Sequence, residues 1–208
     1  MRQKKLNVVP EKQVLKLDLG CGKNKQAGFI GVDALAFTGV DKVLNLAERE
    51  PFKPGDNFYK SWNNPIFKKW PWEDNSVNEV HCSHFVEHLD SKERIHFFNE
   101  LYRILQKDGK ATIVVPHWKS SRAYGDLTHQ WPPVVEFFWY YLDKTWREAN
   151  APHIDLNCDF NCTWGYSLAH PWGLKNQEAQ GFALNHYTEV AQDMIATCIK
   201  REHSVSGH

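Results

Sequence analysis

The chain has 208 residues and carries 25 Lys and Arg against 25 Asp and Glu, so its formal net charge at pH 7 is zero. This length is typical of one ordinary domain, and the charge balance lacks the basic excess that binding to nucleic acid or an anionic membrane usually needs. We therefore expect a single domain over residues 1–208 that binds neither nucleic acid nor a membrane.

Neither a secretory signal nor a membrane span can be recognised, because no stretch approaches about 18 uninterrupted apolar residues. We expect a cytoplasmic protein. The cysteines are odd in number and form no CxxC pair, which argues against a disulfide framework and against a four-thiolate zinc site. They are Cys21, Cys82, Cys158, Cys162 and Cys198.

Five short apolar runs have the length and the bounding residues of buried parallel strands. The first ends at Gly20-Cys21-Gly22, and the fifth is closed by Pro116. A loop rich in Pro, Asn and Trp, residues 47–76, separates the third run from the fourth. The five runs cover residues 14–19, 29–33, 40–46, 77–82 and 111–115.

The clearest helix is predicted over residues 91–106, between the fourth and fifth strands. Asp90 can cap its first turn, Glu93 three residues later completes a capping box, and Gly109 follows the end as a stop signal. A strand, this helix and a second strand make a right-handed βαβ unit. Units of this kind specify a parallel sheet covered by helices.

Aromatic residues become dense after Pro116. Trp131-Pro132-Pro133 is predicted to open a helix through Tyr141 that caps the sheet edge. One face of this helix would carry Val134, Phe137, Phe138, Tyr141 and Leu142, whereas Trp139 and Tyr140 would point elsewhere. Residues 155–167 and 193–200 are candidates for a closing strand pair, with a helix from about Asn176 between them. The elements together predict an α/β fold: a Rossmann-like, doubly wound, mostly parallel sheet of about seven strands, with helices on both faces and an aromatic-rich cap after the fifth strand.

The central chemical signal is Leu17-Asp18-Leu19-Gly20-Cys21-Gly22, followed eleven residues after the last glycine by Asp33. Glycines let the backbone approach a ligand closely, and an acidic side chain at the end of the second strand can accept both hydroxyls of a ribose. A dinucleotide fingerprint would need a third glycine where Lys25 stands. The pattern therefore favours a nucleoside without a pyrophosphate.

With these residues in view, the chain resembles the class I S-adenosylmethionine (SAM)-dependent methyltransferases, especially compact members with LDLGCG and HxxEHL motifs. The resemblance covers roughly residues 13–116, which would form the cofactor-binding core, with residues 117–208 as the acceptor-side cap and closing strands. The matching elements stand in order at residues 17–22, 31–33, 71–72, 74–77, 84–89, 103–109 and 113–116.

This resemblance implies a SAM site at the ends of the first four strands. Asp18 with Gly20 and Gly22 would surround the methionine part and the sugar, and Asp33 would hold the ribose. Asn45 and Leu46 would lie near adenine. Ser83 and His84 would lie beside the methionine part and the acceptor. Asn45 replaces the acidic residue common in the family. The full expected set is Asp18, Gly20, Cys21, Gly22, Asp33, Ala34, Asn45, Leu46, Ser83 and His84.

Three residues after the fifth strand are candidates for acceptor binding or proton removal, namely His117, Asp126 and His129. For each one singly, an ordinary turn-forming or hydrogen-bonding role is the commoner explanation. Trp118, Trp131 and Trp139 are candidate walls of an acceptor pocket. We expect an enzyme that transfers the methyl group of SAM to a small-molecule acceptor, whose identity the sequence does not disclose.

Several alternatives remain open. The same fold can serve a SAM-binding protein without catalysis or a SAM-cleaving lyase. His84-Phe85-Val86-Glu87-His88 also matches the HxxEH pattern of inverted zinc peptidases, in which the two histidines bind zinc and the glutamate acts as base. Against that interpretation, His84 follows a predicted strand directly, where the methyltransferase pattern accounts for it. We therefore expect no metal site.

Overall fold

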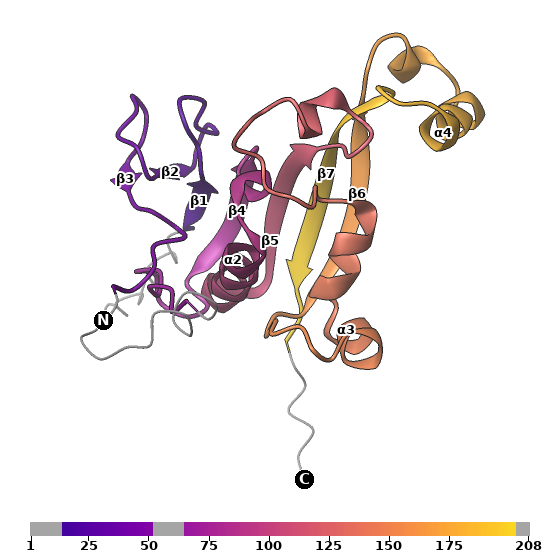
Figure 1. Cartoon of the computed structure of the whole chain (residues 1–208). Helices are drawn as coiled ribbons and strands as arrows, with labels where there is room; N and C mark the ends of the chain where they lie inside the picture. Colours follow the sequence, from indigo (N-terminus) through magenta and orange to yellow (C-terminus); the bar gives the residue numbers. More distant parts are fainter. Residues whose placement is uncertain (1–13, 52–64, 203–208) are drawn as a thin grey trace, which may run out of the picture.

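The structure is a computed structural model that describes residues 14–51 and 65–202. Its centre is a seven-stranded sheet in the order β3-β2-β1-β4-β5-β7-β6 (Figure 1). Neighbouring strands from β3 to β5 pair in parallel, whereas β7 runs antiparallel to both β5 and β6. The strands are β1 (Lys16–Leu19), β2 (Ile30–Asp33), β3 (Lys42–Val43), β4 (Val77–Ser83), β5 (Leu105–Pro116), β6 (Phe160–Leu168) and β7 (Ala191–Lys200). The mostly parallel α/β sheet with its aromatic cluster is confirmed.

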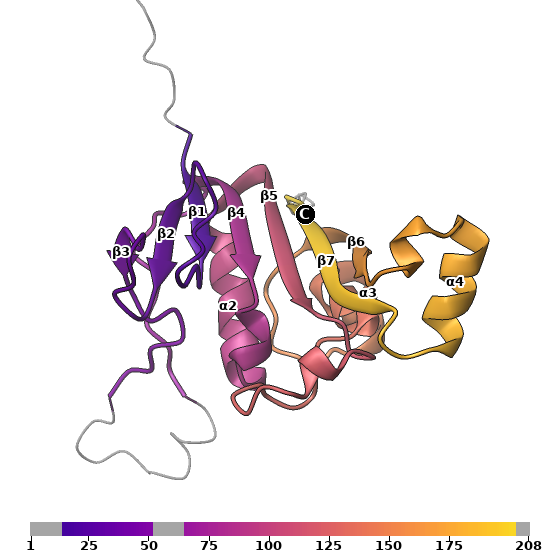
Figure 2. The ribbon, with the colours of Figure 1, turned by 90° about the horizontal axis from the view of Figure 1, so that it is seen from above.

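The longest helix, α2 (Ser91–Ile104), packs on one face of the sheet (Figures 1 and 2). Asp90 caps it as expected: its side chain accepts hydrogen bonds from the amides of residues 92 and 93, and the Asp90 amide donates to the Glu93 carboxylate. The other helical segments are η1 (Val86–His88), η2 (Ser121–Ala123), η3 (Glu136–Leu142), α3 (Lys144–Asn150), η4 (Trp172–Leu174) and α4 (Gln177–His186). Within the described residues, no helix has the length and apolar character needed to cross a membrane.

The hydrophobic core lies between the sheet and the layer formed by α2 and η3. Alternate strand residues such as Val80, Ile113 and Ala196 are fully buried on this face and belong to one hydrophobic cluster with Phe98 of α2. Phe98 in turn packs against Trp139 of η3, with ring centroids 6.4 Å apart and planes at 83°. The α2 and η3 helices therefore share one core.

The opposite face of the sheet carries polar residues and none of the described helices. Lys16, Glu79 and Lys110 form a row across β1, β4 and β5, with both lysines 2.8 Å from the Glu79 carboxylate. The connections from β1 to β2 and from β2 to β3 are turns without a helix. In the part of the chain that is described, the expected helices on both faces are thus found on one face, because these two connections are too short for a crossover helix.

Two boundaries differ from the sequence prediction. The α2 helix ends at Ile104, and the chain passes at Leu105 directly into β5, so Gly109 lies inside a strand instead of stopping the helix. The third strand pairs over only two residues, Lys42–Val43. In both cases strand pairing decides where the element starts or ends, which local propensity does not encode.

The segment after Trp131 differs more. Its helix begins at Glu136 as a 3₁₀-helix with Val135 as N-cap, so the two prolines precede the helix instead of lying in its first turn. A 3₁₀-helix places residues three apart on one face. Trp139 and Leu142 are therefore buried, whereas Phe137, expected inside, is 52% exposed. Of the predicted face, Val134 and Leu142 are buried and Phe138 and Tyr141 pack against the core, so the α-helical period was wrong for Phe137 and Trp139.

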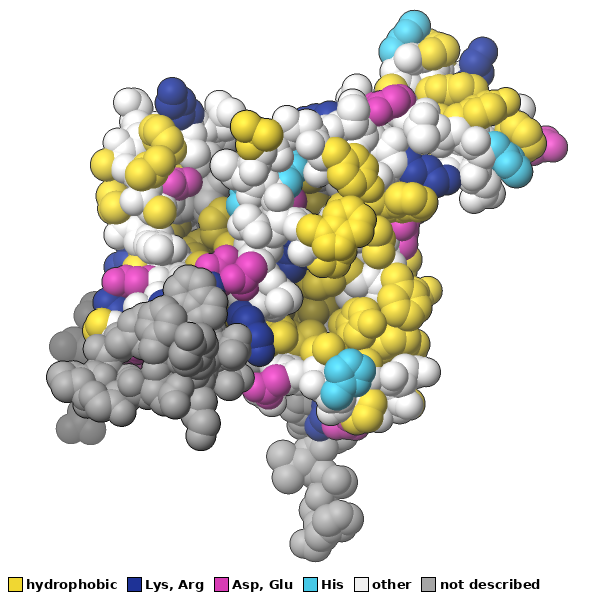
Figure 3. Space-filling view, in the orientation of Figure 1, with side chains coloured by type: hydrophobic (Ala, Val, Ile, Leu, Met, Phe, Trp, Pro, Cys, Tyr) yellow, Lys and Arg dark blue, Asp and Glu magenta, His cyan; other side chains and the backbone are white. Residues whose placement is uncertain are grey.

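The closing elements agree with the prediction. The antiparallel pair β6–β7 forms, and α4 lies between the two strands in sequence with Asn176 as its N-cap. The α4 helix extends outward beyond the β6 edge of the sheet (Figures 1 and 2). Hydrophobic side chains gather over the region of η3 and β6 (Figure 3), which contains the exposed Phe137 and Tyr140.

Candidate functional site

The bend after β1 contains two glycines, and glycine is needed at each of them for a different physical reason. Gly20 and Gly22 have φ angles of +68° and +52°, a region that favours glycine. A Cβ at Gly20 would lie 2.4 Å from Cδ2 of Phe85, whereas a Cβ at Gly22 would meet nothing within 4 Å. Gly20 is therefore required by packing inside the protein, and Gly22 faces open space that a ligand can enter.

Asp33 converges on this bend. Its Oδ2 accepts a hydrogen bond from the Gly22 amide at 2.9 Å, and its Oδ1 accepts one from the Leu35 amide at 2.9 Å. Each carboxylate oxygen has a second lone pair, so both can still accept a ribose hydroxyl. The bend is also tied to β2, because the amides of Gly20 and Cys21 both donate to the Val32 carbonyl. The bend and the carboxylate therefore form one rigid corner.

Asp18 has an internal role. It is 1% exposed, its Oδ1 lies 2.7 Å from Nδ1 of His81, and its Oδ2 accepts from the Gln26 amide at 2.6 Å. These contacts hold the loop between β1 and β2. Cys21 next to the bend is buried, and burial together with the charges of Asp18 and Asp33 raises the pKa of its thiol. Asp18 thus positions the corner, and Cys21 stays a neutral thiol.

Three expected residues on the β2 and β3 side differ in exposure. Ala34 is exposed directly after Asp33. Asn45 is exposed, and its Oδ1 accepts from the Ala47 amide at 3.0 Å, so its amide nitrogen is directed elsewhere. The Leu46 side chain is buried in the core, while its carbonyl accepts from Nε1 of Trp70 at 2.9 Å. The Leu46 side chain therefore packs in the core beneath the site and is not exposed to a ligand.

Ser83 and His84 end β4 at the same sheet edge. His84 has a φ of +55°, uncommon for a residue other than glycine, and its amide donates to the Val114 carbonyl at 2.9 Å. Its ring lies between two carboxylates, with Nδ1 3.3 Å from Glu87 Oε1 and Nε2 3.8 Å from Asp193 Oδ1. The Glu87 carboxylate raises the pKa of His84 against the opposing effect of burial.

The three candidate catalytic residues do not form one group. His117 is 3% exposed and both ring nitrogens are engaged: Nε2 lies 3.1 Å from Glu136 Oε1, and Nδ1 accepts from the Lys119 amide at 3.2 Å. That arrangement requires the proton on Nε2, so the His117 ring is not a free base. Asp126 is exposed and accepts from the amide and hydroxyl of Thr128, and His129 lies beside His88 instead of His117.

Glu136 is a site residue that sequence reasoning missed. Its carboxylate accepts from Tyr166 and His117, and also from Nε1 of Trp118 at 2.9 Å. Burial opposes ionisation, but the hydrogen bonds from His117, its own backbone amide and Tyr166 lower the pKa of Glu136 to about 2. Burial and the adjacent Glu136 charge raise the pKa of Tyr166 to about 12. Glu136 is hidden from sequence analysis because Tyr166 lies thirty residues away on β6.

This group lines a polar cavity of about 440 Å³ at the carboxyl end of β5. Its walls include Trp118, an expected pocket residue, and it is closed on one side by α4. The other two expected walls lie elsewhere: Trp139 is buried in the core, and Trp131 is 79% exposed. The full lining is His117, Trp118, Lys119, Glu136, Tyr166, Gly181, Leu184 and Asn185.

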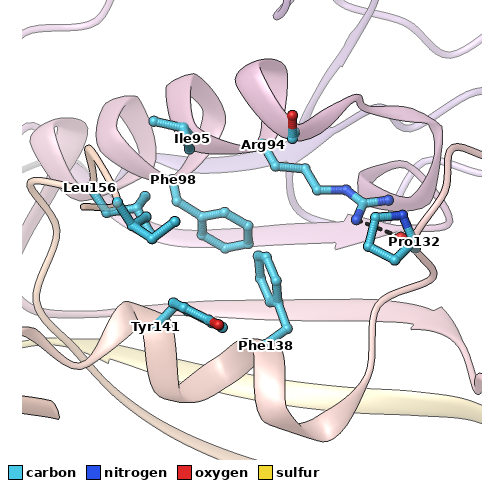
Figure 4. A pocket seen from close by; sticks show the side chains of 9 residues that line it. Arg94, Ile95, Phe98, Pro132, Phe138, Tyr141 and Leu156 are labelled. Atoms are coloured by element: carbon cyan, nitrogen blue, oxygen red, sulfur yellow. Dashed lines mark hydrogen bonds between the residues drawn. The ribbon is translucent and has the colours of Figure 1, made fainter. Parts of the chain in front are cut away.

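A second cavity of about 190 Å³ lies between α2 and η3 and is lined almost entirely by apolar groups (Figure 4). Phe98 and Phe138 face each other inside it, with ring centroids 5.3 Å apart. At one end the Arg94 guanidinium donates to the Pro132 carbonyl at 2.8 Å. This cavity is a gap between the two packed helices and offers few polar groups to orient a ligand.

The HxxEH segment does not form the peptidase geometry. Only Val86–His88 is helical, as a three-residue 3₁₀ turn, and His84 precedes that turn with a left-handed backbone. The two histidines therefore do not lie one α-helical turn apart on a common helix face, which the inverted zinc peptidase requires.

Comparisons with known proteins agree with this fold. Residues 17–113, somewhat less than half of the chain, match a family model described as a methyltransferase domain. No curated protein matches the chain. A SAM-dependent methyltransferase structure from Archaeoglobus fulgidus has a TM-score of 0.56 at 19% identity and covers 91% of this chain and 87% of its own.

Two further structures show the same likeness. A SAM-dependent methyltransferase from Methanosarcina mazei has a TM-score of 0.51 at 14% identity, covering 92% of this chain and 94% of its own. A chain in the complex between the Haloferax volcanii Trm112 methyltransferase activator and the putative methyltransferase has a TM-score of 0.53 at 12% identity, covering 95% and 86%. At identities this low, the structural matches establish a common fold and nothing more. The domain match over residues 17–113 and this shared fold make the chain similar to the SAM-dependent methyltransferases.

Proposed function

We propose that this chain transfers the methyl group of SAM to a small-molecule acceptor, with the cofactor held at the corner formed by Gly22 and Asp33. The observation that carries this assignment is the 2.9 Å contact between Asp33 and the Gly22 amide, at a glycine whose added Cβ would meet no described atom within 4 Å. A carboxylate on a rigid strand end can hold two ribose hydroxyls, and a glycine backbone lets the sugar approach. Ser83 and His84 at the end of β4 would face the methionine part.

The acceptor is proposed to enter the polar cavity beside Glu136 at the carboxyl end of β5. SAM supplies an electrophilic methyl group on a sulfonium, so the protein mainly has to position the acceptor and exclude water. Glu136, ionised over the neutral pH range by its low pKa, can attract a cationic or hydrogen-bond-donating acceptor. His117 fixes the orientation of this carboxylate. Asp126 and His129 remain candidates for acceptor contact from the neighbouring loop.

The first experiment measures thermal stability with SAM and with S-adenosylhomocysteine for the parent, Asp33→Ala and a control, Asp155→Ala. A ligand at a hundredfold excess over its dissociation constant stabilises the parent by about 2.7 kcal/mol. Asp33→Ala should lose most of that gain, and Asp155→Ala, an exposed residue beside Asn99 of α2, should keep it. An unchanged gain in Asp33→Ala, or no gain in the parent, would overturn the proposed cofactor site.

The second experiment separates transfer from binding. Methyl-labelled SAM is incubated with the protein and with metabolite, protein and RNA fractions, and products are identified by mass spectrometry. A labelled small molecule supports the proposal. Cleaved SAM without a labelled acceptor would indicate a lyase, binding without turnover would indicate a non-catalytic SAM-binding protein, and label in RNA or protein would refute a small-molecule acceptor.

A further inference from the structure

Three side chains outside the cofactor corner meet where the loop after β5 crosses η1. Glu87 and His88 come from η1, and His129 comes from the loop, so the cluster joins residues about forty positions apart. One ligand atom from each lies within 4.8 Å of the other two. The rings of His88 and His129 lie 4.7 Å apart at 72°. We call these three residues the Glu87 cluster.

Glu87 is the unusual member. It is 4% exposed, and among the described residues neither carboxylate oxygen has a hydrogen-bond partner, although His84 Nδ1 lies 3.3 Å from Oε1. The nearby Arg94 does not satisfy it, because this guanidinium donates to the carbonyls of Val86, Gln130 and Pro132. A buried carboxylate without hydrogen bonds is costly, and coordination of a cation is one of the few ways to compensate it.

Both histidines are oriented through the same ring atom. His129 Nδ1 lies 3.1 Å from the Ala123 carbonyl, which can only accept, so Nδ1 carries the proton. His88 Nδ1 lies 2.9 Å from Thr128 Oγ1, and that hydroxyl donates to Asp126 at 2.7 Å, so His88 Nδ1 is the donor there as well. Each ring therefore keeps the lone pair of Nε2 free. Metal-binding histidines are commonly held in this way by a carbonyl or by a chain to a carboxylate.

The backbone fixes the loop against η1 independently of any ion. The Gln130 amide donates to the Glu87 carbonyl at 2.8 Å, and Arg94 bonds the carbonyls on either side of Trp131. The residue preceding Gln130 is His129, so these bonds place its ring at the carboxylate. The three donors are therefore preorganised before a ligand arrives.

We propose that Glu87, His88 and His129 bind a first-row divalent transition-metal ion, with Zn²⁺ as the best match to two imidazoles and one carboxylate. This set differs from the sequence expectation of no metal, and it also differs from the peptidase pattern, because His129 takes the place of His84. Three protein ligands leave a coordination position for water or for an atom of a bound molecule. The Asp126–Thr128 pair then has an orienting role, acting through His88.

The test is Zn²⁺ titration of the full chain, stripped with EDTA and dialysed, by calorimetry, with Co²⁺ absorption as a second readout of coordination. The parent should bind one equivalent. Glu87→Gln and His129→Ala should weaken binding by at least about a hundredfold, and Thr128→Val, which alters only the outer contact, by about 10–100-fold. His153→Ala, an exposed histidine outside the cluster, should bind like the parent.

Absence of a one-to-one site in the parent, or parent-like affinity in both His129→Ala and Glu87→Gln, would refute the metal site. Thr128 is exposed, so Thr128→Val remains informative if the buried Glu87→Gln variant does not fold. Stabilisation by SAM is measured in parallel with EDTA present. A chain that gains stability from SAM but binds no Zn²⁺ refutes only the metal site, and the reverse result refutes only the proposed cofactor site.

Discussion

The two glycines of the bend after β1 allow a matched pair of substitutions. Gly20→Ala and Gly22→Ala add the same methyl group at similar positive φ angles, which costs an L-residue about 1–2 kcal/mol. At Gly20 the methyl group also overlaps Phe85, with contacts of 2.7 Å to Cβ and 2.4 Å to Cδ2, and overpacking of this kind adds about 1–3 kcal/mol. We expect a loss of about 2–5 kcal/mol for Gly20→Ala and about 1–2 kcal/mol for Gly22→Ala.

The loss of SAM-induced stabilisation should be larger for Gly22→Ala than for Gly20→Ala. Because only open space surrounds the added methyl group at Gly22, that group occupies the volume proposed for the ribose. Urea unfolding followed by tryptophan fluorescence, with and without saturating SAM, measures both quantities. We expect Gly22→Ala to lose only the about 1–2 kcal/mol that its positive φ costs, but to lose most of the SAM-induced gain in unfolding free energy.

The two substitutions test two separate features of the bend. If Gly20→Ala is no less stable than Gly22→Ala, the close packing against Phe85 is not the reason for glycine at position 20. If Gly22→Ala keeps the full stabilisation by SAM, the space beside Gly22 is not where the cofactor approaches.

Three further predictions concern stability. The pKa of Glu136, lowered to about 2, lies below its unfolded value of about 4.3. The ionised carboxylate therefore stabilises the fold fully above pH about 4.3, by about 1–2 kcal/mol after allowance for solvent screening, and this stabilisation is lost as pH falls toward 2. Glu136→Gln should flatten this acid limb in pH-dependent unfolding. Trp139→Ala should cost about 3–5 kcal/mol in urea unfolding, whereas the exposed Trp131→Ala should change stability by less than about 0.5 kcal/mol; equal effects would contradict the 3₁₀ face. Lys200→Met should cost about 2–3 kcal/mol by thermal unfolding, because the ammonium donates to Asn75 and two backbone carbonyls, and a neutral outcome would show that water replaces these bonds.

The sequence predicted elements well where the signal was local. Asp90 and Glu93 form the capping box, and Asn176 caps α4, because a cap depends on atoms within three residues. The turn Gly20-Cys21-Gly22 followed by Asp33 was also readable, since both lie at the ends of adjacent parallel strands. The structure brings the Asp33 carboxylate to the Gly22 amide, as that interpretation of the bend required.

Predictions failed where a residue's environment depended on the period of a helix or on strand pairing. Trp139 was expected to point away from the core because an α-helical period was assumed, but the 3₁₀ period buries it. His117 was a candidate for acceptor binding or proton removal, and only the positions of η3 and β6 show that it is bound to Glu136, which also accepts from Tyr166.

The sequence by itself determined the mostly parallel α/β sheet, the glycine bend with its carboxylate, and the resemblance to the methyltransferases. These features follow from spacings within a few residues and from strand ends that a parallel sheet must bring to one edge. Only the tertiary structure decided that helices cover one face of the described sheet, that Glu136 lines a polar cavity, and that Glu87 and His88 lie next to His129. These contacts join segments that lie twenty to forty residues apart in the sequence. Their geometry depends on loop paths and sheet register, which no local sequence pattern encodes.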